Sequence, residues 1–471
     1  MRAVLGDALL VLSALTLAYF VVLNAIYLTF TAIAWRGLTA HLRLRGHSAI
    51  EESFASPLTP PISILLPAYN EEAVVVESVT SLLNLRYPEF EVVVVNDGSG
   101  DTTLDRLHAE FDLVPVRKAL RTEIATAPIQ TAYVSRRHAN LWVIDKVNGG
   151  KADALNAGVN AARYPLVCAI DADAVLEEDA LLRVAKPMLD YPDLVVATGG
   201  IVRVANGCMI EGGRVLEVNL PRSRLATLQV IEYFRAFLIG RVGWSRMNAL
   251  LIISGAFGLF RRSLVVAVGG YATDTVGEDV ELVVRLHRHL RERDEEYRIE
   301  FVPDPVCWTE APETFRVLSR QRRRWHRGLG ETLWRHRRVA FNPRYGTLGT
   351  LAVPYFILFE FLGPVLELVG PLSIIILWYF GLLSLPFLLG FLAVAFLVGI
   401  LLSIAALALE EFSFRRHRRN REVARLLAFS LVENLGYRQL IGFWRLLAFV
   451  DLARRKRGWG DMQRKGFGTT S

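Results

Sequence analysis

Uncharged apolar stretches lie towards both ends of the chain and flank a middle region of shorter apolar runs. Residues 8–34 carry no charged side chain, and such a run is long enough for a helix to cross a bilayer. A cleaved signal peptide is the alternative, but the run is longer than a signal core and Trp35-Arg36 is a poor cleavage context. The chain becomes apolar again from Leu348 to Leu409, with interruptions at prolines and glycines.

Basic side chains beside these stretches predict their orientation in the membrane. Arg36, Arg43 and Arg45 follow the first apolar run closely, whereas only one basic residue precedes it. Basic clusters also lie on both sides of the second region, at 335–338 and 414–421. Because positive flanks stay in the cytoplasm, the amino terminus is predicted to lie outside.

The second apolar region is long enough for two crossings, and an even number keeps both of its basic flanks in the cytoplasm. We place them at about 350–380 and 387–410. The first is overlong, which predicts a tilt, a kink or a re-entrant start. Its Glu360 and Glu367 are expected to face other helices or a polar passage. Residues 423–450 are apolar but contain charges, so we predict an interfacial or hairpin-like helix there. The protein is thus predicted to cross the inner (plasma) membrane three times, with a cytoplasmic catalytic region and tail.

The middle of the chain alternates short apolar runs with helical patterns, which predicts a mostly parallel sheet in an α/β domain. A helix is expected from about 73 to 85, and another from Lys151. Ligands bind outside the carboxyl ends of strands in such sheets, and several polar residues follow those ends, so a shared site is expected. The predicted strands are 62–66, 91–95, 141–144, 166–170 and 194–198.

Asp171 and Asp173 follow the apolar run 166–170, separated only by Ala172. Residues two apart on an extended segment point the same way, so both carboxylates can share one target. Carboxylates at a strand end suit Mg²⁺ or Mn²⁺, which usually also hold substrate phosphates. The plain alternative is a solvated turn with two exposed acids, which is favoured if the motif is taken alone.

Two further strand ends carry candidate donor contacts. Asp97 could accept hydrogen bonds from the polar edge of a nucleobase, and Gly98 would let the chain turn tightly beside it. An Asx-turn explains Asp97 equally well. Lys151 follows two glycines and opens a helix, so it could offer a positive charge to a diphosphate. A surface lysine in a turn is the alternative.

Composition narrows the class of partner. The formal net charge is +7, the pI is about 9.4 and the mean hydropathy is +0.31. The arginines cluster beside apolar segments and no nucleic-acid recognition motif is present, so a lipid bilayer is the predicted partner and nucleic acid is not. Cys168, Cys208 and Cys307 are widely spaced in apolar surroundings, which predicts neither a disulfide framework nor a metal cluster.

An ordered set of motifs over about residues 60–335 resembles the membrane-bound, often processive members of glycosyltransferase family 2. These members are the hyaluronan, cellulose, chitin and poly-N-acetylglucosamine synthases. Each motif is weak alone, but the set in this order is specific. The motifs are Pro67-Ala-Tyr-Asn-Glu-Glu72, Val95-Asn-Asp97-Gly-Ser99, Gly150-Lys151-Ala-Asp-Ala-Leu-Asn156, Asp171-Ala-Asp173, Ser254-Gly-Ala-Phe-Gly258, Gly277-Glu278-Asp279 and Gln321-Arg-Arg-Arg324-Trp325.

The resemblance implies a GT-A (Rossmann-like) fold with transmembrane and interfacial helices, a UDP-sugar donor, a divalent metal and inversion at the anomeric carbon. It implies Asp279 as the general base beside Glu278, and Asp171 and Asp173 as the metal site. The implied donor contacts are Ala68, Tyr69, Glu71, Asp97, Lys151, Asp171, Gln321 and Arg324, and the implied acceptor contacts are Gly255, Ala256, Phe257 and Trp325. The corresponding parts are residues 1–45 (first crossing), 46–200 (nucleotide-sugar half), 201–340 (acceptor half), 341–412 (membrane helices) and 413–471 (basic interfacial helix and tail).

The acceptor half contains side chains suited to these roles. Asp279 could take the proton of an acceptor hydroxyl, although a carboxylate there could also cap the helix expected at 280–290. Arg324 can grip a diphosphate with its planar fork, and Trp325 offers a flat apolar face to a sugar ring. Gln321, Arg324 and Trp325 fall on one helical side, which leaves the other arginines of 320–327 for lipid headgroups.

Residues 222–251 show an apolar stripe at helical spacing. A core helix would explain the stripe, but the neighbouring membrane segments favour an interfacial helix that turns the acceptor site towards the bilayer.

The leading hypothesis is a membrane-embedded enzyme that transfers a sugar from a UDP-sugar to a growing polysaccharide and can pass the product through its helices. The first alternative is transfer of a single sugar to a lipid acceptor. The non-enzyme alternative is a membrane transporter or scaffold with a degenerate nucleotide fold, which the intact Asp171, Asp173 and Asp279 disfavour.

Overall fold

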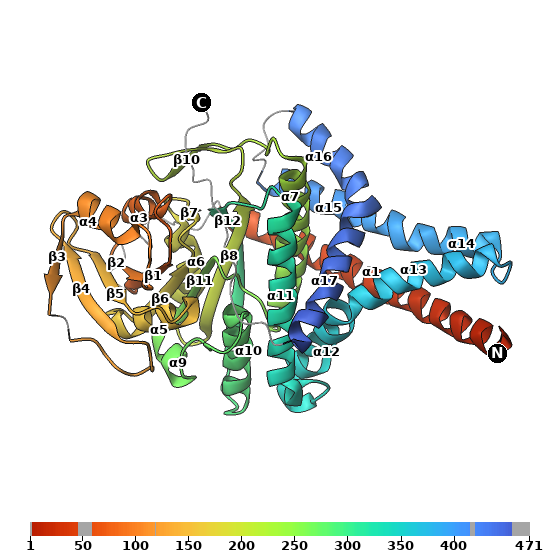
Figure 1. The fold of residues 1–471 in the computed structure, drawn as a ribbon, viewed down its shortest axis with the longest axis horizontal. Helices are drawn as coiled ribbons and strands as arrows, with labels where there is room; N and C mark the ends of the chain where they lie inside the picture. Colours follow the sequence, from red (N-terminus) through yellow and green to blue (C-terminus); the bar gives the residue numbers. More distant parts are fainter. Residues whose placement is uncertain (1, 46–58, 118, 415–419, 455–471) are drawn as a thin grey trace.

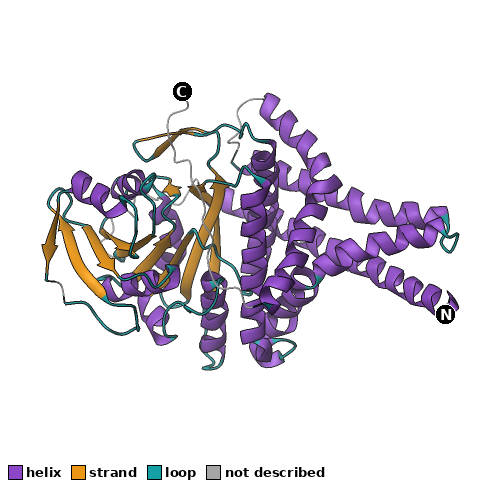
Figure 2. Ribbon diagram, in the orientation of Figure 1, coloured by secondary structure: helices purple, strands orange, loops and turns teal. Residues whose placement is uncertain are grey.

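The structure is a computed structural model, and it describes residues 2–45, 59–117, 119–414 and 420–454. Figure 1 shows three parts side by side. A sheet covered by helices lies at one end, long apolar helices extend from the other end, and an upright group of helices that includes α7, α11 and α17 stands between them. Figure 2 shows that every strand belongs to the first part or to the hairpin above it.

The sheet has ten strands in the order β3-β4-β5-β2-β1-β6-β11-β8-β12-β7. The predicted parallel core exists, since β5, β2, β1 and β6 pair in parallel, as do β8 and β12. The other pairings are antiparallel, so the sheet is mixed rather than mostly parallel. The strands are β1 (Ile62–Ala68), β2 (Phe90–Asn96), β3 (Leu113–Val116), β4 (Ile129–Ser135), β5 (Leu141–Lys146), β6 (Leu166–Ile170), β7 (Ala174–Leu176), β8 (Val195–Val204), β11 (Phe257–Arg261) and β12 (Arg298–Thr309), and β9 (Met209–Glu211) with β10 (Arg214–Glu217) forms a separate hairpin.

Strands β1, β2 and β6 are buried along nearly their whole length, which matches their continuous apolar sequences. Strand β11 is inserted antiparallel between β6 and β8, because its partner residues run in opposite order along both neighbours. It therefore joins the strands up to β6 to the later strands β8 and β12. The helices around the sheet are α3 (Val75–Leu83), α4 (Thr103–Phe111), α5 (Lys151–Ala161), α6 (Ala180–Asp190), α9 (Arg262–Ala267) and α10 (Glu278–Arg291).

Helices over the two apolar regions are long and apolar enough to cross a membrane. Within the part of the chain that the structure describes, two helices are long and apolar enough to cross a membrane, Leu10–Arg43 and Leu385–Ser413. A third candidate is the pair Leu348–Phe361 and Gly363–Tyr379, which is bent by 48°, as expected for the overlong segment. The elements are α1 (Arg2–Arg45), η4 (Leu348–Ala352), α12 (Val353–Tyr355), η5 (Phe356–Phe361), α13 (Gly363–Tyr379), α14 (Leu385–Leu392), η6 (Ala393–Leu397) and α15 (Val398–Ser413).

The amino-terminal end of α1 and the turn between α13 and α14 lie at the same end of the molecule, away from the sheet (Figure 1). Helix α1 packs against both α13 and α15. This arrangement is the one expected if α1 crosses once and the two later segments form a hairpin beside it.

The region predicted as interfacial or hairpin-like is broken near its middle. It contains α16 (Asn420–Val432), η7 (Glu433–Tyr437) and α17 (Arg438–Ala453). Leu435 and Gly436 have non-helical backbone angles, and Gly436 has a φ of 108°, which favours glycine. The chain is therefore kinked there, and α17 packs on α11 (Phe315–Arg335) and α13.

The apolar stripe at 222–251 forms α7 (Arg224–Phe234), η1 (Arg235–Arg241) and α8 (Val242–Arg246). Its apolar side is buried, with Ile231 and Leu238 fully covered. The segment contacts β8 on one side and α1, α15 and α16 on others. It therefore joins the sheet to the membrane helices rather than lying as a free surface helix. The short helices η2 (Arg337–Val339) and η3 (Pro343–Tyr345) connect α11 to the membrane segment.

Candidate active site

One cavity of about 2230 Å³ joins the carboxyl ends of the central strands to the membrane helices. It is lined both by residues of the sheet and by residues of α1, η5, α13 and α17. Nearly all of the predicted site residues line it: Ala68, Tyr69, Glu71, Asp97, Lys151, Asp171, Asp173, Gly255, Ala256, Glu278, Asp279, Gln321, Arg324 and Trp325.

Phe257 is the exception among the predicted acceptor contacts. It begins β11 and pairs with Ile170 of β6. Its side chain is fully buried in the main hydrophobic core and is not among the described residues that line the cavity. The prediction that Phe257 contacts the acceptor is therefore wrong, because alternation along β11 turns this side chain away from the cavity.

Asp171 and Asp173 lie directly after β6, at the mouth of the sheet. The Asp171 backbone N–H donates to the Ala256 carbonyl, 3.4 Å away, which ties this turn to the acceptor half. The Ser78 hydroxyl of α3 donates a hydrogen bond to the Ala172 carbonyl. The Asp173 residue is 9% exposed. Among the described residues no group of three or more His, Cys, Asp or Glu side chains could hold a metal ion.

Lys151 is the first residue of α5 and connects the two acidic parts of the cavity. Its Nζ lies 2.5 Å from Asp171 Oδ1 and 3.4 Å from Glu278 Oε1. It also donates to the Gly255 carbonyl at 3.4 Å. Burial alone would lower the pKa of Lys151, but Asp171 and Glu278 outweigh burial and raise it. The ammonium therefore stays charged among the carboxylates.

Asp97 organises the loop that leads into Lys151. Its carboxylate accepts hydrogen bonds from Lys146 Nζ (2.6 Å), the Gly149 N–H (3.0 Å) and the Gly150 N–H (2.7 Å). Gly150 has a φ of 90°, a conformation that a side chain would strain. Asp97 is therefore a loop anchor whose carboxylate already accepts three hydrogen bonds, and any contact to a nucleobase is made in addition to these.

Glu278 and Asp279 are the first two residues of α10. The helix N-cap is Gly277, so the alternative role of Asp279 as the cap is wrong. Asp279 faces the Ser254–Ala256 segment, since a Cβ on Gly255 would lie 2.9 Å from Asp279 Oδ2. Burial raises the pKa of the Glu278 carboxyl, Lys151 opposes that rise and Asp279 adds to it.

Two glycines bring α10 and α11 into direct backbone contact. A Cβ on Gly277 would lie 2.9 Å from the Gly328 Cα, and a Cβ on Gly328 would lie 2.8 Å from the Gly277 Cα. Either substitution would push the helices apart. This contact places Asp279, two residues after Gly277, beside the helix that carries Arg324 and Trp325.

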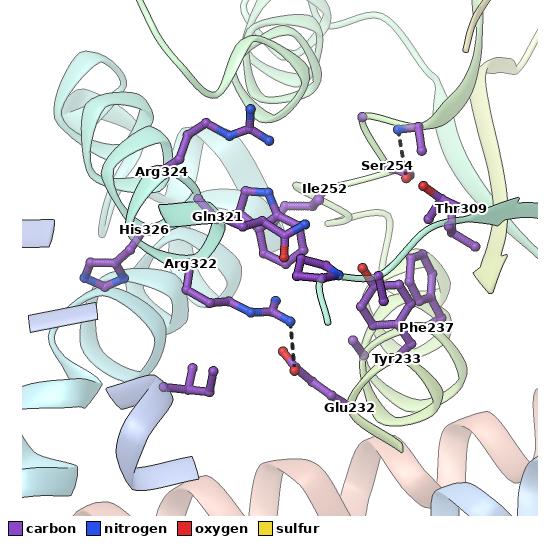
Figure 3. A pocket seen from close by; sticks show the side chains of 18 of the residues that line it. Glu232, Tyr233, Phe237, Ile252, Ser254, Thr309, Gln321, Arg322, Arg324 and His326 are labelled. Carbon is purple, nitrogen blue, oxygen red and sulfur yellow. Dashed lines mark hydrogen bonds and ion pairs between the residues drawn. The ribbon is translucent and has the colours of Figure 1, made fainter. Parts of the chain in front are cut away.

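Helix α11 presents Gln321, Arg324 and Trp325 to the cavity, as their helical spacing predicts. Figure 3 shows Gln321 and Arg322 on the cavity side of this helix, with Glu232 opposite them. The prediction that the remaining arginines meet lipid headgroups is wrong for Arg322 and Arg327, which are buried in ion pairs, whereas Arg323 is paired but its side chain stays 31% exposed. Arg322 pairs with Glu232, Arg323 with Asp451 and Arg327 with Glu331.

Two groups of polar residues were missed in the sequence, one behind the cavity-lining Asp97 and one at the cavity itself. Lys146 is fully buried and bridges Asp97 and Asp153, both at 2.6 Å; a lysine that ends an apolar strand was the signal for it. Glu232 and Tyr437 approach Arg322 from helices far away in sequence. No local sequence pattern could reveal the cluster of Glu232, Arg322 and Tyr437, because it depends on tertiary packing.

The part of the cavity lined by the membrane helices, called here its membrane half, contains several polar contacts. Tyr19 donates to Glu367 Oε1 at 2.9 Å. Arg445 lies 3.1 Å from Glu360 Oε2. The prediction that both carboxylates face other helices or a polar passage is met on both counts, since their partners lie on α1 and α17 and both line the cavity. Deeper in the same region Glu433 pairs with Arg235 at 2.7 Å.

The fold and the motif order define a GT-A glycosyltransferase, and the family comparison agrees. Residues 60–328, more than half of the chain, match the family described as glycosyltransferase like family 2. The chain belongs to this family.

Curated relatives are poly-β-1,6-N-acetyl-D-glucosamine synthases. The chain is 33% identical to the one from Staphylococcus epidermidis over 276 residues, which is 58% of this chain and 56% of the relative. It is 31% identical to the one from Staphylococcus aureus (strain COL) over 299 residues, 63% of this chain and 60% of the relative. The chain thus spans under two thirds of the length of these relatives.

A mannosyltransferase from Pyrobaculum calidifontis, solved with GDP-Man and Mn²⁺, shares the fold. Its TM-score is 0.51 at 20% identity, and the match covers 92% of this chain and 100% of that chain. Because this match spans both the sheet and much of the helical part, it confirms the predicted fold class.

Proposed function

We propose that the protein is an inverting glycosyltransferase of the membrane that transfers N-acetylglucosamine from UDP-N-acetylglucosamine to the growing end of a polysaccharide. The observation that carries the proposal is the single cavity in which Asp171, Asp173 and Asp279 share space with the membrane helices. The relatives named poly-β-1,6-N-acetyl-D-glucosamine synthases support the choice of sugar.

The chemistry follows from the placement of charge around the cavity. Asp279 accepts the proton of the acceptor hydroxyl as that oxygen attacks the anomeric carbon from the side opposite UDP. Lys151 and Arg324 line the same cavity and carry the positive charge that a leaving diphosphate needs. Trp325 is 43% exposed and supplies the flat surface on which the acceptor sugar lies.

Asp171 and Asp173 fit a divalent cation of the Mg²⁺ or Mn²⁺ type. Such cations are commonly held by one or two carboxylates together with substrate phosphates and water, and a pair of carboxylates at a strand end is what the cavity offers. When bound, the cation neutralises charge on the leaving diphosphate. The Lys151 ammonium lies against Asp171 and holds that carboxylate in place at the mouth of the cavity.

The membrane half of the cavity suits an uncharged glycan. Its lining carboxylates Glu360 and Glu433 are paired with arginines, and Glu367 accepts a tyrosine hydroxyl. A chain that carried a carboxylate on every second sugar would have to bury those charges beside groups that are already paired. An N-acetylglucosamine polymer brings only hydroxyl and amide groups, which supports a polymer that enters this half.

The proposal is tested by a donor screen on the purified protein in lipid. UDP release and product size are measured together with UDP-N-acetylglucosamine, UDP-glucose, UDP-galactose and UDP-glucuronic acid. We expect release and polymer only with UDP-N-acetylglucosamine. Release with a product of one added sugar on lipid would instead identify single transfer to a lipid acceptor. No release with any of the four donors would contradict the proposal, and no release with every nucleotide sugar would favour the non-enzymatic role.

The membrane orientation gives a separate prediction. We expect the amino terminus outside, three crossings, a cytoplasmic carboxyl tail and a catalytic domain in the cytoplasm, because basic residues flank each predicted cytoplasmic end. Single cysteines at Ala3 and Thr470 are labelled in sealed cells with a reagent that cannot cross the membrane. Labelling at position 3 alone is expected, and labelling at position 470 alone would invert the orientation.

A further inference from the structure

Arg322 lies inside the motif Gln321-Arg-Arg-Arg324-Trp325, directly after Gln321. Its guanidinium carbon is 4.4 Å from the centre of the Trp325 ring, so it covers one face of the indole. The Arg322 residue is only 5% exposed, whereas Trp325 remains 43% exposed. One side of the indole is therefore occupied by a buried cation, while the residue keeps open surface in the cavity.

A second contact fixes the guanidinium itself. Arg322 Nη2 donates to Glu232 Oε2 of α7 at 2.9 Å, shown as a dashed line in Figure 3. The Tyr437 hydroxyl donates to the same carboxylate oxygen, also at 2.9 Å. Tyr437 directly follows the break at Leu435 and Gly436. The carboxylate thus joins α11, α7 and the kinked segment η7 at one point.

This cluster faces the cavity rather than the protein interior alone. Glu232, Arg322, Trp325 and Tyr437 all line the cavity. Arg322 Nε is buried and has no hydrogen-bond partner among the described residues. A buried ion pair of this kind costs desolvation energy, and breaking it by removing one partner is more costly still. The Arg322–Glu232 pair is therefore well suited to keep the Arg322 side chain in one position.

We propose that Arg322, held by Glu232 and Tyr437, is a positioning residue for the acceptor: it fixes the Trp325 indole so that the sugar at the growing end binds on the open face. The inference rests on the proposed function. A guanidinium stacked on an aromatic ring restricts that ring, and the sugar then binds a surface that is already ordered. Loss of the stack affects acceptor binding, whereas the proposed donor contacts Asp97 and Lys151 lie outside α11, the helix that carries Arg322.

The chain contains a matched control on the same helix. Arg323 is the next residue and also forms an ion pair, with both of its contacts to Asp451 at 2.7 Å. Among the described residues that line the cavity, neither Arg323 nor Asp451 appears. Arg323→Met therefore removes the same type of side chain and a comparable ion pair without touching Trp325.

The test compares wild type with Arg322→Met, Arg322→Lys, Glu232→Gln and Arg323→Met in lipid. UDP release is measured at saturating UDP-N-acetylglucosamine against the concentration of a β-1,6-linked N-acetylglucosamine tetrasaccharide, and UDP affinity is measured by calorimetry. Arg322→Met is expected to raise the acceptor KM about tenfold with kcat and UDP affinity within about twofold of wild type. Arg322→Lys should recover part of the loss, since it keeps a cation over the ring.

Equal effects of Arg322→Met and Arg323→Met on the acceptor KM would overturn the proposal, and so would a fall in kcat at unchanged acceptor KM. If Arg322→Met binds no UDP and is thus misfolded, Glu232→Gln and Arg322→Lys decide the matter: an unchanged acceptor KM in both rejects the positioning role. If wild type releases no UDP from UDP-N-acetylglucosamine, the proposed function fails on its own. The same variants are then compared with the donor that the screen identifies and its matching oligosaccharide.

Discussion

Asp279→Asn is expected to lower turnover by a factor on the order of 10² to 10⁴ and to leave UDP affinity unchanged. The amide keeps the size and the polar contacts of the carboxylate but cannot accept the proton of the acceptor hydroxyl. The donor loses little, because Asp97 and Lys151 lie on other elements that the substitution does not touch. Turnover is measured by UDP release and UDP affinity by calorimetry.

Two variants make this result specific to the base. Asp274→Asn removes a carboxylate that pairs with Arg335 outside the cavity, and its side chain is 71% exposed, so it should leave turnover within about twofold of wild type. Asp97→Ala should show the reverse pattern to Asp279→Asn and weaken UDP binding, because the Gly149–Gly150 loop loses its anchor. Near-normal transfer by Asp279→Asn would move the base to another carboxylate, with Glu278 the first candidate.

Asp173→Asn is expected to nearly abolish turnover while the protein stays folded. Asp171 and Asp173 provide the only paired carboxylates proposed for the cation, and an amide is a much weaker ligand for Mg²⁺ or Mn²⁺. Loss of Mn²⁺ binding, measured by electron paramagnetic resonance in the presence of UDP, should accompany the loss of turnover. Excess chelator should abolish wild-type activity in the same way.

Asp179→Asn is the control for the Asp173→Asn variant. Asp179 precedes α6 and pairs with Arg183 at 2.5 Å, away from the residues that line the cavity, so both Mn²⁺ binding and turnover should be retained. Full wild-type activity in excess chelator would contradict the metal assignment outright. Retained Mn²⁺ binding in Asp173→Asn with lost turnover would assign Asp173 a different role from that of a ligand.

The strand ends could be predicted from the sequence because their signal is local. An apolar run such as 166–170 followed by Asp171 and Asp173 needs only the period of a strand and the rule that ligands bind at carboxyl ends. The helix face that carries Gln321, Arg324 and Trp325 follows in the same way from helical spacing. These predictions place side chains on an element, and the element then brings them to the cavity.

Other features depend on packing that no short pattern encodes. Phe257 lies in a motif with Gly255 and Ala256, yet the direction of β11 buries it. Basic residues near apolar helices indicate lipid headgroups, but Arg322 and Arg323 find carboxylates that lie 90 and 128 residues away in the sequence. The edge strand β3 and its neighbour β4 were also missed, because their residues are less buried than those of the central strands and carry no continuous apolar run.

We propose that the sugar transferred at Asp279 joins a polymer that enters the membrane half of the same cavity. The most direct measurement uses sealed vesicles in which the catalytic domain faces outward and radiolabelled UDP-N-acetylglucosamine is supplied outside. After synthesis, a β-1,6-N-acetylglucosaminidase is added with and without detergent. We expect polymer that resists the glycosidase until detergent opens the vesicles, and polymer that is fully degraded without detergent would contradict the claim.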